Sequence, residues 1–174
     1  MPIVKQRPGN KGKNQTLMFL AQISDSVEKI IHLDLIEGGM KTEDFHKFLS
    51  DFNPPNNGKK NVLIMDNLRV HKAKQSCIDL GLPTIEELLT SKDIEVIFLP
   101  SYTPELNPIE KINHIIKDHV RKEEARNKEK LRLTIEEKVK FFQKEDLNTY
   151  LDNSVNECLM KLNSTVQFEG NTLI

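Results

Sequence analysis

The chain has 174 residues, of which 37% are apolar and 29% are charged, and this composition suits one globular domain or one domain with an appendage. Its formal net charge is −1. Domains that bind nucleic acid on their own usually carry a clear excess of positive charge, so the net charge argues against autonomous, tight DNA binding.

No apolar run approaches the roughly 18 residues that span a bilayer, and the N-terminus lacks the apolar core of a signal peptide. Together with two distant cysteines and no Cys/His cluster, this predicts a cytoplasmic protein with reduced thiols and no membrane partner.

The first part of the chain predicts a hairpin and then a helix. Residues 1–14 are basic and turn-rich, and we expect a loose lead-in. Residues 16–36 contain an apolar run followed by alternating apolar and polar side chains, which predicts two antiparallel strands. Thr42 is a candidate cap for a short helix that follows. The apolar face of this helix would consist of Phe45, Phe48, Leu49 and Phe52.

Two later apolar runs predict buried strands. They are VLIM at residues 62–65 and IEVIFL at residues 94–99. Helical segments are expected between them, around 72–80 and at 84–90. Because strands joined by helical crossovers run parallel, we predict an α/β fold with a mixed sheet whose later strands are parallel.

The last third of the chain predicts helices. One helix is expected from Asn107 into the 120s, with apolar residues at helical spacing. A further helical region is expected at about 134–162, where Thr134 and Glu137 could form a capping box. Its later half would present an apolar face of Leu147, Leu151, Val155, Cys158 and Leu162. We expect the end of the chain to be frayed.

Two acidic residues stand where sheet folds of this kind bind ligands. Asp66 follows the first buried strand, at the carboxyl edge where open α/β sheets place their ligands. Glu110 lies eleven residues beyond Leu99, the end of the second buried strand. If the strands are neighbours, the two carboxylates converge and repel unless a cation lies between them. Oxygen ligands without Cys or clustered His suit Mg²⁺, and such sites commonly catalyse phosphoryl transfer.

Each of these residues also has a structural interpretation. The Asp66-Asn67 pair at a strand end is typical of a turn, in which the Asp side chain bonds nearby backbone amides. Glu110 falls at the third position of a helix capped by Asn107, with a proline at the first position, and a capping box places an acidic side chain there. His71 is more often a packed or surface imidazole than a catalytic one. Spacing alone therefore favours structural roles over a metal site.

Two stretches together resemble a known signature. MDNLRVHKAK (65–74) and IFLPSYTPELNPIEKI (97–112) closely resemble the mariner-like DDE transposases, insertion-sequence enzymes whose DDE superfamily endonuclease domain has an RNase H-like fold. The second motif matches over about a dozen consecutive positions, and the resemblance covers about residues 12–122. It implies a division into a lead-in (1–14), a partial catalytic domain (15–122), a C-terminal helical extension (123–163) and a tail (164–174).

The resemblance implies a role for each matching residue. Asp66 would be the second acidic ligand and Glu110 the third, both binding Mg²⁺, with Mn²⁺ as an alternative ion. Residues that line or brace the site would be Asn67, His71, Tyr102 and Asn107. Residues that contact DNA, both transposon ends and target, would be Arg69, Lys72 and Lys111. Capping and metal binding by Glu110 are compatible, because a helix N-terminus made rigid by prolines fixes the position of a carboxylate.

The first aspartate of the family has no counterpart at the expected place. Residues 1–14 contain no acidic residue, Asp25 falls in the hairpin turn, and Asp34 falls in the second hairpin strand. The resemblance therefore predicts a sheet without its first, central strand, and a chain without the N-terminal helix-turn-helix module. The intact enzyme would use Mg²⁺-activated water to nick DNA at element ends, and then the freed 3′-hydroxyl to attack target DNA. We expect this chain to be incomplete and inactive by itself.

Two other functions remain open. The chain could be a non-catalytic partner that docks on a full-length transposase or forms homo-oligomers, with the apolar face at 147–162 as the candidate contact. Packing of that face on its own domain is the simpler use. The third hypothesis is an RNase H-like nuclease that acts on another nucleic acid. If active, the protein would be associated with the nucleoid.

Overall fold

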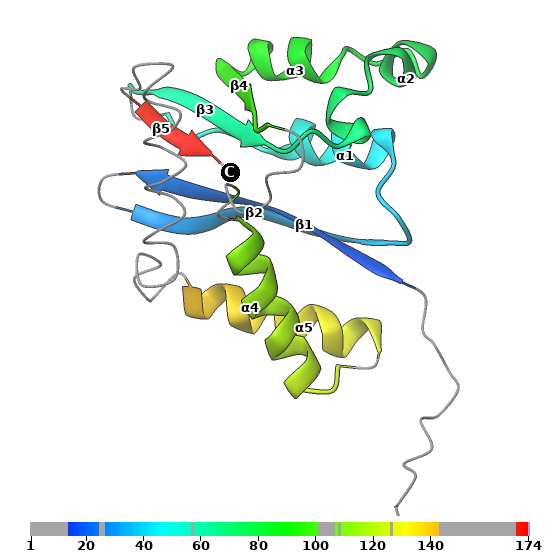
Figure 1. Ribbon diagram of the computed structural model, residues 1–174, viewed down its shortest axis with the longest axis vertical. Coiled ribbons are helices and arrows are strands. Elements are labelled where there is room, and N and C mark those ends of the chain that lie inside the picture. Colours follow the sequence, from blue (N-terminus) through cyan, green and yellow to red (C-terminus); the bar gives the residue numbers. More distant parts are fainter. Residues whose placement is uncertain are drawn as a thin grey trace, which may run out of the picture.

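The computed structural model describes residues 14–24, 27–56, 58–100, 107, 109–125, 127–142 and 170–173. They form a mixed α/β fold, as predicted, in which helices cover both faces of a sheet (Figure 1). The sheet has five strands in the order β2-β1-β5-β3-β4. In the part of the chain just given, no helix combines the length and apolar character needed to cross a membrane.

The predicted hairpin is confirmed. Strands β1 (Gln15–Ser24) and β2 (Val27–Glu37) pair antiparallel along their length. Because successive strand residues point to opposite faces, Met18 and Leu20 of β1 enter one core, while Leu17 and Phe19 pack toward the other.

The two predicted buried strands are parallel neighbours. β3 (Lys60–Met65) is buried from its second residue onward, and it pairs in parallel with β4 (Ile94–Phe98). In β4 only Ile94 is fully buried, so the expectation of a strand buried throughout was wrong there. The reason is that β4 is the last strand in the order of the described sheet, where β3 is its one described neighbour.

One face of the sheet is covered by α1 (Thr42–Asp51), α2 (Lys74–Asp79) and α3 (Ile85–Ser91), with a short 3-10 helix η1 (Arg69–Lys72) before α2 (Figure 1). The predicted apolar face of α1 is confirmed, since all four of its side chains are buried. Thr42 is the first helical residue and not the cap. Lys41 occupies the cap position, and its backbone N–H donates to the Asp44 carboxylate at 3.0 Å.

The opposite face is covered by α4 (Ile109–Lys122) and α5 (Lys128–Phe142) (Figure 1). Their core side chains, with those of the sheet, are Ala21, Ile30, Ile64, Leu99, Ile112, Ile116, Ile135 and Phe142. Helix α5 begins earlier than predicted, because the Asn127 side chain accepts the Lys130 N–H at 2.7 Å. Thr134 is consequently buried inside the helix and does not cap it. The apolar face predicted at 147–162 lies outside the described residues.

The centre of the sheet is held by a strand from the C-terminal end. β5 (Gly170–Leu173) pairs antiparallel with β1 and parallel with β3. The expectation of a frayed end was wrong for these four residues, and the rest of the expected tail lies outside the described part. The sequence did not predict this strand, because glycine and asparagine have low β-propensity. Its extended conformation is explained by pairing with strands that are distant in sequence.

Candidate active site

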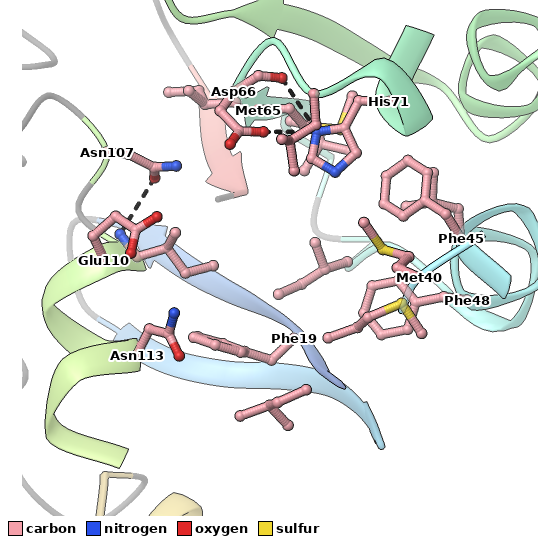
Figure 2. Close-up of a pocket in the computed structure, with 18 residues that line it drawn as sticks. Phe19, Met40, Phe45, Phe48, Met65, Asp66, His71, Asn107, Glu110 and Asn113 are labelled. Atoms are coloured by element: carbon pink, nitrogen blue, oxygen red, sulfur yellow. Dashed lines mark hydrogen bonds and ion pairs between the residues drawn. The ribbon is translucent and has the colours of Figure 1, made fainter. Parts of the chain in front are cut away.

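Asp66 is the first residue after β3, at the carboxyl end of that strand. Its side chain is 40% exposed, but one carboxylate oxygen, Oδ1, is buried. The Nδ1 atom of His71 lies 3.2 Å from the Asp66 carbonyl oxygen and 2.9 Å from Oδ1 (Figure 2). Both oxygens are acceptors, so Nδ1 carries a proton, and its hydrogen bond goes to the carbonyl. Oδ1 is therefore left without a hydrogen-bond partner among the described residues.

His71 holds the loop that carries Asp66 against α1. Its side chain is only 13% exposed, and its ring packs on Phe45 with 4.5 Å between centroids. Its backbone N–H donates to the Leu68 carbonyl at 3.1 Å, which closes the turn after Asp66. The imidazole thus joins the acidic residue to the helix layer.

Asn67 ties the ends of the two parallel strands together. Its side-chain amide donates to the Leu99 carbonyl just after β4, and the Leu99 N–H donates to the Met65 carbonyl at 2.8 Å. The other side-chain atom of Asn67, Oδ1, is buried without a partner in the described part of the chain. This geometry is compatible with the bracing role that the resemblance implies, which stays a prediction.

Glu110 lies in the first turn of α4. Asn107 precedes the helix; its side-chain oxygen accepts the Ile109 N–H at 3.4 Å, and its carbonyl accepts the Glu110 N–H at 3.1 Å. The Glu110 side chain forms no hydrogen bond or ion pair with any other residue that the structure describes, so the return bond of a capping box is not formed there. Among the described residues, none competes with a ligand for its carboxylate.

The two carboxylates line the same pocket, whose volume is about 180 Å³. Figure 2 shows Asp66 and Glu110 on either side of its opening, with Asn107 and Asn113 beside them and the apolar side chains beyond. The apolar lining comes from β1, β3, α1, the residues next to them and the first residue of α4: Leu17, Met18, Phe19, Leu20, Met40, Phe45, Phe48, Leu49, Leu63, Ile64, Met65, Leu68 and Ile109. Two acidic groups predicted from separate motifs thus share one cavity.

The donor set at this opening fits a hard divalent cation. It offers the Asp66 carboxylate, whose Oδ1 lies 2.9 Å from His71 Nδ1, and the Glu110 carboxylate, which no described residue pairs. Two neutral amide groups lie beside them, and oxygen ligands of this kind suit Mg²⁺ or Mn²⁺. Within the described ranges, no group of three or more His, Cys, Asp or Glu side chains is arranged to hold a metal. Asp34 accepts the Leu35 N–H at 2.7 Å and does not line the pocket, while Asp25 lies outside the described residues.

The basic residues expected to contact DNA are exposed and close in sequence to the acidic pair. Arg69 and Lys72 belong to η1, directly after Asp66, and Lys111 follows Glu110 in α4. The Lys72 ammonium lies 4.2 Å from the centroid of the Phe98 ring. Tyr102, predicted to support the site, lies outside the described residues.

Asn113 is a site residue that the sequence reasoning missed. It lines the pocket beside Glu110, three residues further along α4. Side chains three apart on a helix share a face, so this spacing was the signal that could have found it.

Comparison with known families identifies one matching family. A sequence model described as DDE superfamily endonuclease matches residues 6–132. The matched range contains both Asp66 and Glu110 and reaches into α5. No curated protein matches the chain.

Proposed function

Because the chain belongs to the DDE superfamily of endonucleases, we propose that it is the catalytic part of a mariner-like insertion-sequence transposase with an RNase H-like sheet. Its substrate would be DNA, cut at the ends of the element and joined to target DNA. One observation carries the proposal: the carboxylates of Asp66 and Glu110, from two separate motifs, line one pocket.

Asp66 and Glu110 are the residues that would hold Mg²⁺ or Mn²⁺. A bound divalent cation would polarise the phosphodiester and make water a better nucleophile at neutral pH. The chain itself supplies fixed positions, because β3 and α4 present the carboxylates and His71 restrains the Asp66 loop. Exposed Arg69 and Lys72 would neutralise DNA phosphates without reading sequence.

The described lining of the pocket contains two carboxylates, whereas the resemblance implies a site with three. A site with two cations needs more ligands than the described residues bring to the opening. We expect the chain by itself to bind one cation and to be inactive in DNA cutting. Loss of one of two metals removes several kcal/mol of transition-state stabilisation, which corresponds to roughly a thousandfold in rate or more.

The test is calorimetric titration with Mn²⁺. The unmodified chain should bind the ion, and Asp66→Asn and Glu110→Gln should each weaken its affinity about tenfold or more. Glu129→Gln is the matched control, since Glu129 is an exposed carboxylate in the first turn of α5, and it should change nothing. Equal Mn²⁺ affinity in the unmodified chain and in both site variants, with unchanged circular dichroism, would overturn the proposal.

The alternative of a non-catalytic partner of a full-length transposase rested on the apolar face at 147–162. That face lies outside the described residues, so this alternative stays a prediction.

A further inference from the structure

Among the described residues, no strand lies between β1 and β3 beyond the end of β5, and this stretch is called the gap. On the edge of β1 that faces β3, only Gln22 and Ile23 pair with β5. On the facing edge of β3, residues 60–63 pair with β5, but Ile64 and Met65 do not. Among the described strands, none pairs with residues 17–21 of β1 on this side.

The pocket beside Asp66 occupies this gap. Its lining includes the consecutive residues 17–20 of β1 and 63–65 of β3. Consecutive strand residues point to opposite faces, so a pocket lined by whole stretches of two strands passes through the plane of the sheet. Apolar side chains of α1 close one side, and Ile109 of α4 lies on the other. These surroundings, apolar on both faces, are those of a central strand.

We propose that the edges formed by residues 17–21 of β1 and 63–65 of β3, the strand slot, bind an extended apolar segment of a second polypeptide. The segment would add to the sheet antiparallel to β1 and parallel to β3. β5 already lies in this orientation at the neighbouring positions, so the sheet accepts a strand of that direction. At about 3.3 Å per residue, the open edge of β1 accommodates a segment of about five to seven residues.

The unpaired strand edges select a polypeptide as the occupant. Backbone N–H and C=O groups in an apolar environment need hydrogen-bond partners, and another strand supplies them along both edges. A small apolar molecule would leave them unsatisfied. A second copy of this chain that donated its own β5 would place the same four residues in the same position and leave the same gap.

The space also suits apolar side chains. The cavity of about 180 Å³ is slightly larger than the roughly 150 Å³ apolar cavity that accepts one benzene. It therefore has room for one or two apolar side chains, and the rest of the segment would lie along the open strand edges. Main-chain hydrogen bonds would give the segment its affinity, and the apolar walls would select its side chains.

β5 would compete with the incoming segment. It is four residues long, and Gly170 and Asn171 are poor strand formers. A longer strand alongside residues 63–65 overlaps Leu173, which pairs with Leu63, so it must displace at least that end of β5. This role in assembly goes beyond catalysis and does not depend on metal binding.

The probe is a fluorescent synthetic peptide of the sequence KKVIVIVIKK, measured by anisotropy. A control peptide with proline in place of the first two isoleucines keeps the charge but lacks backbone N–H groups that a strand donates to its neighbours. The first peptide should bind at least about tenfold more tightly. Hydrogen exchange should then slow at residues 17–21, Ile64 and Met65 and accelerate at Gly170–Leu173. Equal binding of both peptides, or protection elsewhere in the chain, would overturn the proposal.

A variant tests the competition directly. Thr172→Pro removes an N–H from β5, where Thr172 pairs with Ile23 and Val62, and should tighten peptide binding about threefold or more. Asn56→Pro, in the exposed segment before β3, is the control and should leave the affinity unchanged. Displacement of β5 would be contradicted if neither variant bound the peptide more tightly than the unmodified chain. It would also be contradicted if both variants did.

Discussion

The contacts of His71 predict two separable losses of stability. His71→Ala removes the hydrogen bond to the Asp66 carbonyl, about 1 kcal/mol, and the ring contact with Phe45, also about 1 kcal/mol. His71→Phe retains a ring beside Phe45 and loses only the hydrogen bond. The free energy of unfolding should therefore fall by about 2 kcal/mol in the first variant and about 1 kcal/mol in the second. For a chain of this length these losses lower the melting temperature by roughly 6 °C and 3 °C.

Urea denaturation followed by circular dichroism measures both values. His114→Ala is the control, because the His114 side chain is 72% exposed on α4 and its contact with Asp118 is a surface pair, so we expect a change below about 0.5 kcal/mol. Because His71 restrains Asp66, both His71 variants should also weaken Mn²⁺ binding, by about tenfold. Equal destabilisation by His71→Ala and His71→Phe would refute the contribution of the ring contact. Unchanged Mn²⁺ affinity would refute the positioning of Asp66.

Two further predictions concern titratable groups away from the pocket. The backbone N–H and hydroxyl of Thr84 donate to Glu87 and lower the pKa of its carboxyl below 4.5. Glu87 should therefore stabilise the fold fully above pH 4.5 and progressively less as the pH falls further. The free energy of unfolding that Glu87→Gln loses relative to the unmodified chain should be largest above pH 4.5 and shrink as the pH falls, and Glu86→Gln should show no such pH-dependent difference. A loss in Glu87→Gln that is constant with pH would contradict the prediction. Burial raises the pKa of the Cys77 thiol. Iodoacetamide at pH 8 should therefore label Cys77 much more slowly in the folded chain than in urea, and peptide mass spectrometry measures both rates. Equal labelling rates would contradict the burial of Cys77.

Local pattern was sufficient where each element is defined by its own side chains. The alternation at residues 16–36 predicted the hairpin, and the spacing of Phe45, Phe48, Leu49 and Phe52 predicted the buried face of α1. Periodicity carries this information because it reports which side of an element avoids water.

Local pattern failed where the partner is distant in sequence. IEVIFL indicated a strand buried throughout, but the position of β4 at the sheet edge leaves most of it partly exposed. The Thr134 capping box was wrong because Asn127 starts the helix one and a half turns or more earlier, and the α5 side chains then pack on the sheet core.

The sequence by itself determined that Asp66 directly follows an apolar strand and that Glu110 lies in the first turn of a helix. The stretches around both residues resemble DDE enzymes. Only the tertiary structure decided that they line one cavity and that Gly170–Leu173 lies between β1 and β3. The physical reason is range: side-chain periodicity acts over a few residues, whereas strand order is set by backbone hydrogen bonds between segments far apart in the chain.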